Sequence, residues 1–171
     1  MLTPNAMLNI PKLDRIDINI LAELQKAGRI TNADLANKVG LSPSPCLARV
    51  RRLEEAGYIS SYSANLNLRK LRNVQVVFTS VTLGDHRAAD FAKFEQGMQH
   101  VEELVECHLV SGGFDYLLKF VVKGISHYQE MMEQILERNI GVSKYFSYVV
   151  IKSPIVRNYA PVRMLLAPDE D

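Results

Sequence analysis

The first sixty residues alternate between short stretches of helical spacing and turns that contain glycine. Apolar side chains three or four positions apart predict a first helix over 14–27, with a second from Thr31 to Gly40 and a third from Ser42 to Gly57. We expect extended chain, a short ribbon of one or two strands, over 58–68. Three short helices with tight turns and a following strand pair predict a winged helix-turn-helix.

Capping residues mark the ends of these helices. Gly28 stands where a left-handed glycine commonly ends a helix. Thr31 with Asp34 three residues on is a capping pattern for the second helix. Ser42 followed by Pro43 predicts a hydroxyl cap and a proline at the first helical position, where its missing N–H costs nothing. The third helix has an expected apolar stripe of Leu47, Val50 and Leu53.

From Val74 the pattern changes to the period of strands. Ser126 with Gln129 predicts a capping box for a later helix that ends at Gly141. The predicted segments are a strand from Val74, a helix over 85–100, strands over 104–110 and 116–122, a helix after Ser126, and a strand over 145–151. This order of strand, helix, strand, strand, helix and strand is the ferredoxin-like arrangement.

The sequence therefore predicts an α+β protein with two domains. Its parts are a winged helix-turn-helix over 12–68, a linker over 69–73, a ferredoxin-like βαββαβ domain over 74–153 and a Pro-rich C-terminal tail over 154–171. We expect the tail to be irregular, with Met164–Leu166 as apolar residues that could dock on a partner.

Composition excludes several classes of protein. The chain has 171 residues, 47% hydrophobic and 23% charged, which is ordinary for a globular protein and unlike a disordered one. Two cysteines are too few for a secreted disulfide framework. The absence of a long apolar run and of a signal-peptide pattern predicts a cytoplasmic protein with no membrane span.

A basic cluster stands out on a chain whose net charge is only +1. Arg49, Arg51 and Arg52 lie in an acid-free stretch over 40–53. The second helix of a helix-turn-helix enters the major groove by its N-terminal end, here the small residues Ser42, Pro43, Ser44, Pro45 and Cys46. We expect Arg49 and Arg52 to share one face, and Arg51 to reach the flanking DNA backbone. The alternative is a merely solvated arginine face.

Other residues with reactive side chains support weaker hypotheses. Glu106, Cys107 and His108 are adjacent on a predicted strand, so they point to opposite faces and do not make a metal site. Cys46 at a helix start could be an oxidation-sensitive thiol of lowered pKa, although a small packing residue is the simpler interpretation. Methionines at helical spacing, Met98, Met131 and Met132, predict core packing.

Long stretches of the chain resemble the leucine-responsive regulatory protein (Lrp/AsnC) family, and within it the leucine-responsive branch most. In the first domain the resemblance is carried by Leu13–Asp17, Asn19–Leu21, Gly28–Ile30, Val39–Pro43 and Cys46–Glu54. In the second it is carried by Glu106–Gly112, Phe114–Lys119 and Tyr148–Val150. The resemblance covers about residues 12–155.

The resemblance implies a sensing domain that binds an amino acid, such as leucine or another apolar one, between dimers. It implies homodimers that assemble further, here to an expected octamer, and no cofactor. The residues it places in or beside the effector site are Ser111, Gly112, Gly113, Phe114, Asp115, Tyr116, Ile125, Tyr148, Val149 and Val150. Asp115 could instead be a turn residue that satisfies its own backbone.

This chain departs from the family pattern at two of those positions. Gly113 stands where an acid is usual, and Ile125 where methionine is common. The predicted function is a sequence-specific DNA-binding regulator, not an enzyme, whose assembly or DNA affinity responds to an amino acid. The alternatives are an architectural DNA-wrapping protein and a sirohaem-decarboxylase-like enzyme, against which the intact Ser42–Pro43 and Arg49–Arg52 segments argue.

Overall fold

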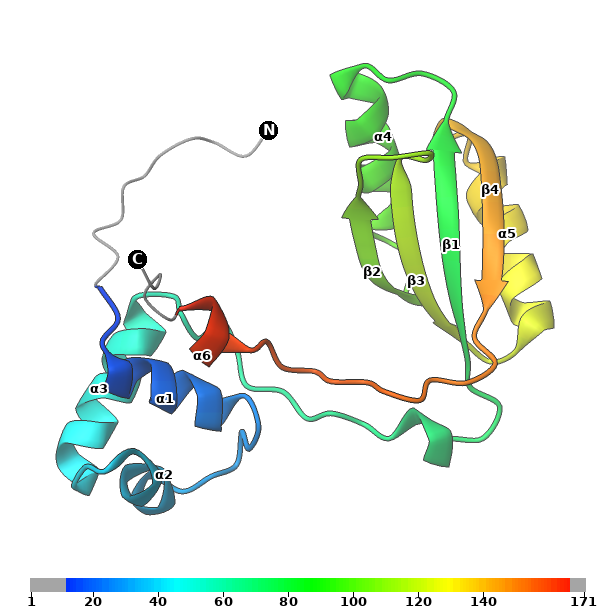
Figure 1. The fold of residues 1–171 in the computed structure, drawn as a ribbon. Helices are drawn as coiled ribbons and strands as arrows, with labels where there is room; N and C mark the ends of the chain where they lie inside the picture. Colours follow the sequence, from blue (N-terminus) through cyan, green and yellow to red (C-terminus); the bar gives the residue numbers. More distant parts are fainter. Residues whose placement is uncertain (1–11, 167–171) are drawn as a thin grey trace. The chain divides into compact units, whose positions relative to one another are not determined.

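The computed structural model describes residues 12–166 (Figure 1). Within this range the chain forms two compact units. The first unit holds the described residues up to Leu66 together with those from Ile155 onward, and the second holds Asn67 to Pro154. The first unit therefore contains both ends of the described chain.

Three helices build the first unit: α1 Arg15–Leu24, α2 Asn32–Val39 and α3 Pro43–Glu55. Each begins at a polar N-cap residue, Asp14, Thr31 or Ser42, of which the sequence predicted the last two. The Asp14 carboxylate accepts from the backbone N–H of Asp17, and the Asp17 carboxylate accepts from that of Asp14, which is a reciprocal capping box. Thr31 accepts from the backbone N–H of Asp34 at 3.1 Å, and a left-handed Gly40 ends α2, so both predictions for α2 are confirmed.

Two predicted helix ends are wrong in detail. The first helix stops at Leu24, with Gln25 as its C-cap in the right-handed region, and Gly28 does not have a positive φ. Ser42 is the N-cap of α3, but its side chain makes no capping hydrogen bond. A capping side chain bonds the amide of the second or third helical residue. Here the third residue, Pro45, has no N–H, which leaves the amide of Ser44, and the Ser42 side chain does not bind it.

The small core of the first unit lies between the three helices. Its buried apolar residues are Ile20, Leu35, Ala36, Cys46, Val50 and Leu53. Cys46 takes the place we predicted for Leu47, which is 40% exposed. The spacing 46, 50 and 53 follows one face of a helix more closely than 47, 50 and 53, so the pattern itself favoured the cysteine.

The ribbon predicted over 58–68 does not form. The described residues between α3 and the short 3₁₀ helix η1 (Leu68–Lys70) contain no strand. Side chains over 60–67 are almost all exposed, so this segment has no buried face to fix a strand register. The segment is instead tied to α3 by the Tyr62 hydroxyl, which donates to the Glu54 carboxylate at 2.7 Å.

The second unit has the predicted order of elements. These are β1 Gln75–Leu83, α4 Ala88–Met98, β2 Leu104–Leu109, β3 Tyr116–Val122, α5 Ile125–Glu137 and β4 Val142–Val149. The strands lie in the order β2-β3-β1-β4, and all neighbours are antiparallel. This is the ferredoxin-like arrangement, so the predicted fold class is confirmed.

The start and end of α5 differ from the prediction. The helix begins at Ile125 after Gly124, whose φ of +123° favours glycine, and no side chain caps it. The predicted Ser126–Gln129 capping box is therefore wrong. The helix ends at Glu137, four residues before Gly141.

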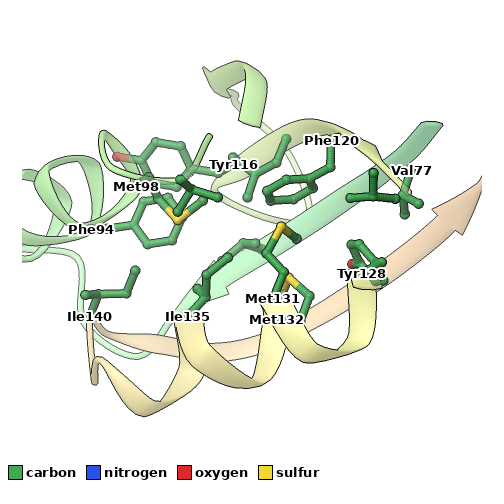
Figure 2. Packing of buried hydrophobic residues seen from close by; sticks show 14 of the residues in the cluster. Val77, Phe94, Met98, Tyr116, Phe120, Tyr128, Met131, Met132, Ile135 and Ile140 are labelled. Atoms are coloured by element: carbon green, nitrogen blue, oxygen red, sulfur yellow. The ribbon is translucent and has the colours of Figure 1, made fainter. Parts of the chain in front are cut away.

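Both helices pack on one face of the sheet, with a continuous apolar core between the two layers (Figures 1 and 2). The residues labelled in Figure 2 include the three methionines predicted to be core, Met98, Met131 and Met132. Alternate residues of β3 point into this core, from Tyr116 to Val122. The opposite face of the sheet carries no helix, and Phe146 and Tyr148 of β4 are about half exposed there.

The C-terminal tail returns to the first unit, where its short helix α6 (Val162–Leu165) contacts α1. Gln25 holds the tail by two hydrogen bonds with the backbone of Ala160, one donated by its amide at 3.0 Å and one accepted at 2.8 Å. Arg163 binds Asn19 and Glu23, both at 2.9 Å. Residues 167–171 of the predicted tail lie outside the described residues.

Candidate DNA-binding surface and effector site

The face of α3 opposite the core carries small and basic side chains. Ser44, Ala48 and Arg51 lie four and three positions apart, and with Leu47 they form one exposed stripe. The first helical residues, Pro43 to Pro45, are also exposed. A surface of this kind lets a helix approach the floor of a DNA groove closely, with one arginine to reach a base edge or a phosphate.

The start of α3 offers few backbone donors. Pro43 and Pro45 have no N–H, and the amide of Cys46 donates to the carbonyl of Ser42 at 3.3 Å. Ser44 is left as the single free backbone amide of the first turn. Phosphate binding at this helix end therefore depends on that amide and on the Ser42 and Ser44 hydroxyls, and less on the helix dipole than we expected.

Two of the three predicted DNA-binding arginines are held by α1. Arg49 binds Asp14 at 2.6 Å and Asp17 at 2.8 Å, and Arg52 binds Asp17 at 2.6 Å. The two carboxylates raise the pKa of Arg49, through their hydrogen bonds and their charge. Arg49 and Arg52 share one face as predicted, but that face is turned toward α1, and Arg51 lies on the exposed stripe.

The sequence reasoning missed Asp14 and Asp17 as partners of α3. The sequence carries a signal for this pairing, since the two acids and the two arginines have the same spacing of three residues, one helical turn. It also missed Asn32, whose side-chain amide donates to the carbonyl of Pro43 at 2.8 Å and so fixes the start of α2 to the start of α3.

Cys46 is fully buried, and burial raises the pKa of its thiol. The hypothesis of an oxidation-sensitive thiolate at the helix start is therefore wrong, because such a thiol needs a lowered pKa and access to solvent. Packing explains this residue. Its position in the core also removes it from the set of predicted DNA-contacting side chains.

The predicted effector residues fall into two groups at opposite ends of the sheet. The first group is the β2–β3 hairpin, where the backbone N–H of Asp115 donates to Val81 near the end of β1. The second group is Ile125 with Tyr148–Val150, beside the start of β1, where Val149 lies opposite Val77. From Val77 to Leu83 the strand rises roughly 20 Å. One chain therefore does not bring the two groups together.

Asp115 is engaged within its own chain. Its carboxylate accepts from the backbone N–H of Leu83 at 2.8 Å and lies 3.0 Å from a ring nitrogen of His86. The carboxylate thus binds the end of β1 and the loop that follows it, and not the backbone of its own turn as our alternative had it. Ser111, Gly112 and Gly113 at the hairpin tip are exposed, and Phe114 is half-buried.

Tyr116 lies in the core, which contradicts its placement on an effector surface. Its ring centroid is 4.5 Å from that of Phe94, and its hydroxyl donates to Glu95 at 2.8 Å. Burial, followed by the Glu95 hydrogen bond, raises the pKa of the Tyr116 phenol. A substitution here would report on packing and not on effector contact.

A cavity of about 360 Å³ lies between α5 and the α4–β2 loop. Its lining includes the apolar residues Val101, Met131 and Ile135, and a ring nitrogen of His127 that lies 3.0 Å from the Glu103 carboxylate. None of the predicted effector residues lines it. It is therefore separate from the predicted effector site.

Glu106 on β2 binds Lys119 of β3 at 2.7 Å, and this hydrogen bond lowers the pKa of the glutamate. His108 is on the same face as Glu106, and Cys107 points to the other. Within residues 12–166 no group of three or more His, Cys, Asp or Glu side chains is placed to hold a metal ion. The helices of that range include none with the length and apolar character of a membrane span.

Comparison with known families matches both units. Residues 13–60 match a family described as winged helix-turn-helix DNA-binding, and residues 76–159 match the Lrp/AsnC ligand binding domain. The leucine-responsive regulatory proteins of Escherichia coli K12 and Klebsiella pneumoniae are each 50% identical over 140 residues, which is 82% of this chain and 85% of theirs. The resemblance seen in the sequence is thus confirmed.

Solved structures agree with these relatives. A transcriptional regulator of Neisseria meningitidis, in complex with L-methionine, superposes with a TM-score of 0.84 at 30% identity. An AsnC family regulator of Agrobacterium tumefaciens gives 0.83 at 31% identity. Each alignment covers 90% of this chain and 99% of the other. The chain therefore belongs to the Lrp/AsnC family, and it is a ligand-responsive DNA-binding transcription regulator rather than an enzyme.

Proposed function

We propose that this regulator binds specific DNA sequences through the exposed stripe of α3 and responds to an apolar amino acid, leucine or one similar to it. The observation that carries the DNA part is the orientation of α3. Its core face is apolar and its α1 face is occupied by ion pairs, which leaves Ser44, Ala48 and Arg51 to meet a groove. Since DNA is its target, we place its action in the cytoplasm, with the chromosome.

The test for the DNA surface starts with selection of binding sequences from a random pool, followed by isotherms against the selected and an unrelated fragment. We expect Arg51→Gln to weaken binding and to reduce the slope of log affinity against log salt by about one if the arginine contacts a phosphate. If it reads a guanine, the loss is instead about 1–3 kcal/mol and specific to that base pair.

Arg87→Gln in the second unit is the matched control, since it removes the same charge from an exposed site far along the chain from α3. Unchanged affinity and slope in the Arg51 variant would contradict the assignment. Equal affinity of the wild type for selected and unrelated fragments would instead favour an architectural DNA-wrapping protein.

We propose that the effector site is completed between copies of the chain. The hairpin tip of one copy would supply backbone amides to the carboxylate of an amino acid, and Ile125 and Val149 of another would supply an apolar wall. Tyr148 lies on the opposite face of β4. The exposure of Ile125 and Val149, 43% and 44%, supports a role in contact with a partner or ligand. The relatives named for leucine and bound to L-methionine support the apolar class.

Calorimetric titration of the intact protein with leucine, methionine and aspartate tests this proposal. We expect the two apolar amino acids to bind and aspartate to bind at least about tenfold more weakly. Val149→Asp should abolish binding of leucine while the far-UV spectrum stays unchanged. Equal binding of all three amino acids would contradict an apolar site.

We propose that the open face of the sheet forms a homodimer, and that dimers assemble to an octamer. Phe146 and Tyr148 are about half exposed on that face beside Phe78 and Leu117, and an apolar face of this kind is normally covered. Light scattering should give at least twice the 19.3 kDa of one chain. Phe146→Lys should lower that mass and Ile151→Lys, outside the sheet, should not. A monomeric wild type would contradict the proposal.

A further inference from the structure

Asp17 is the one charged residue among the described positions whose side chain is fully buried. A carboxylate removed from water costs free energy unless ionic and hydrogen-bonding partners replace the lost hydration. Well-packed apolar residues often stabilise a core as well as such a group does. A buried aspartate in the smallest core of the molecule therefore calls for an explanation beyond stability.

The partners of Asp17 come from two helices. One carboxylate oxygen accepts from Arg49 at 2.8 Å, and the other accepts from Arg52 at 2.6 Å and from the backbone N–H of Asp14 at 3.1 Å. Arg49 and Arg52 are one helical turn apart, so a single fixed carboxylate holds two points along α3. Two such points fix the rotation of α3 about its own axis.

We propose that Asp17 is the positioning residue of the DNA-reading helix: it holds Arg49 and Arg52 toward α1 and so turns Ser44, Ala48 and Arg51 outward. The inference rests on the proposed DNA surface and adds what sets its orientation. With these ion pairs in place, Arg51 is the arginine of α3 that meets DNA. Without the Asp17 charge, Arg52 can leave α1 and bind a phosphate regardless of sequence, while Asp14 still holds Arg49 at 2.6 Å.

The role predicts opposite effects on two measurable properties. In Asp17→Asn the shape and one acceptor remain. Arg52, whose side chain is 45% exposed, loses its carboxylate partner and can turn to solvent, whereas Arg49 keeps its ion pair with Asp14. We expect affinity for the selected fragment relative to an unrelated one to fall about tenfold or more, the loss of about one good base contact. We expect the salt slope for the unrelated fragment to steepen by about one, for the released Arg52.

Asp90→Asn is the matched control. Asp90 is also the third residue of its helix, and it accepts from the backbone N–H of Arg87 at 3.1 Å, so the variant loses the same charge from the same kind of position in the second unit. A purely structural role for Asp17 would lower affinity for both fragments in proportion to the unfolded fraction and leave the salt slope unchanged. That result, with a folded Asp17→Asn protein, would overturn the proposal.

Arg52→Gln keeps the proposal testable if the Asp17 variant fails to fold, because Asp17 then keeps Arg49 and Asp14 as partners. We expect its salt slope on both fragments to equal that of the wild type, since Arg52 is committed to Asp17. A slope reduced by about one would mean that Arg52 contacts phosphate, and would overturn the proposal. Failure of the DNA surface itself would appear separately, as an unchanged slope in Arg51→Gln.

Discussion

The interactions that stabilise the fold inside each unit of this regulator differ between the two units. The second unit packs two helices on a sheet around a continuous core of fifteen buried residues, including Phe94, Phe120 and Ile135. The core cluster of the first has six buried residues, and charged and polar contacts between its segments add to it. Those contacts join Asp17 to α3, Glu23 to α2 and to the tail, and Gln25 to the tail.

This difference matches what each unit does. The stability of a large apolar core depends little on pH near neutrality, and such a unit is suited to assembly. A small core leaves the orientation of helices undecided, and ion pairs then select one arrangement, at a modest gain in stability. We infer that the ion pairs of the DNA-binding unit make its stability more sensitive to acid and salt, and that they fix the orientation of its DNA-reading surface.

The largest effect is expected in the core of the second unit. Phe120 is fully buried in the middle of β3, with its ring edge-on to Tyr128 at 5.9 Å (Figure 2). Phe120→Ala should lower the free energy of unfolding by about 3–5 kcal/mol, because it leaves a cavity between sheet and helices. Hydrogen exchange across a urea series should show the loss in the second unit.

Val105→Ala, at a half-exposed position of the edge strand β2, is the control and should cost less than about 1 kcal/mol. If Phe120→Ala lowered the protection of α1–α3 as much as that of the sheet, the two units would unfold as one. The comparison between them would then fail.

A smaller effect is expected where the tail meets α1. Gln25→Ala removes two exposed hydrogen bonds to Ala160, and we expect a loss of about 1 kcal/mol in the first unit. Amides over 160–166 should exchange faster, and the midpoint of the second unit should not move. Gln134→Ala, an exposed glutamine of α5, is the matched control. Unchanged exchange in the tail would show that Gln25 does not hold it.

The order of elements in both units was predictable because it follows from local periodicity. Apolar positions in α3 and α5 recur at helical spacing, and those of β1 and β3 alternate. Helix ends were less predictable. Ser42 occupies the predicted N-cap position but makes no capping hydrogen bond, since Pro45 has no amide and the amide of Ser44 is not bound. Gly28 lies three residues beyond the C-cap of α1.

The candidate sites were predictable by location and less so by role. The basic cluster correctly drew attention to α3, but the partners of Arg49 and Arg52 lie 32 and 35 residues earlier in the chain, beyond any local pattern. The effector residues come from a family resemblance that carries no information about distance. Their separation along β1 becomes visible only when the strand register is known.

The smallest predicted effect tests whether ion pairs stabilise the first unit. The pKa of Glu23 is held below its usual value of 4.5, mainly by the hydrogen bond from Lys38 at 3.2 Å and also by that from Arg163. A depressed folded pKa means that Glu23 contributes stability that is fully present above pH 4.5 and lost as the pH falls through the folded value.

We therefore expect the free energy of unfolding of the first unit, from urea titrations at pH 6 and pH 3, to fall more in wild type than in Glu23→Gln. The difference between the two falls should be less than about 1 kcal/mol. Glu106→Gln is the control, because the pKa of Glu106 is depressed in the same direction by Lys119 in the second unit. It should change the acid response of that unit alone. Identical acid curves for wild type and Glu23→Gln would mean that this ion pair contributes nothing, and that the small core of the first unit depends on Asp17 and its arginines for its polar support.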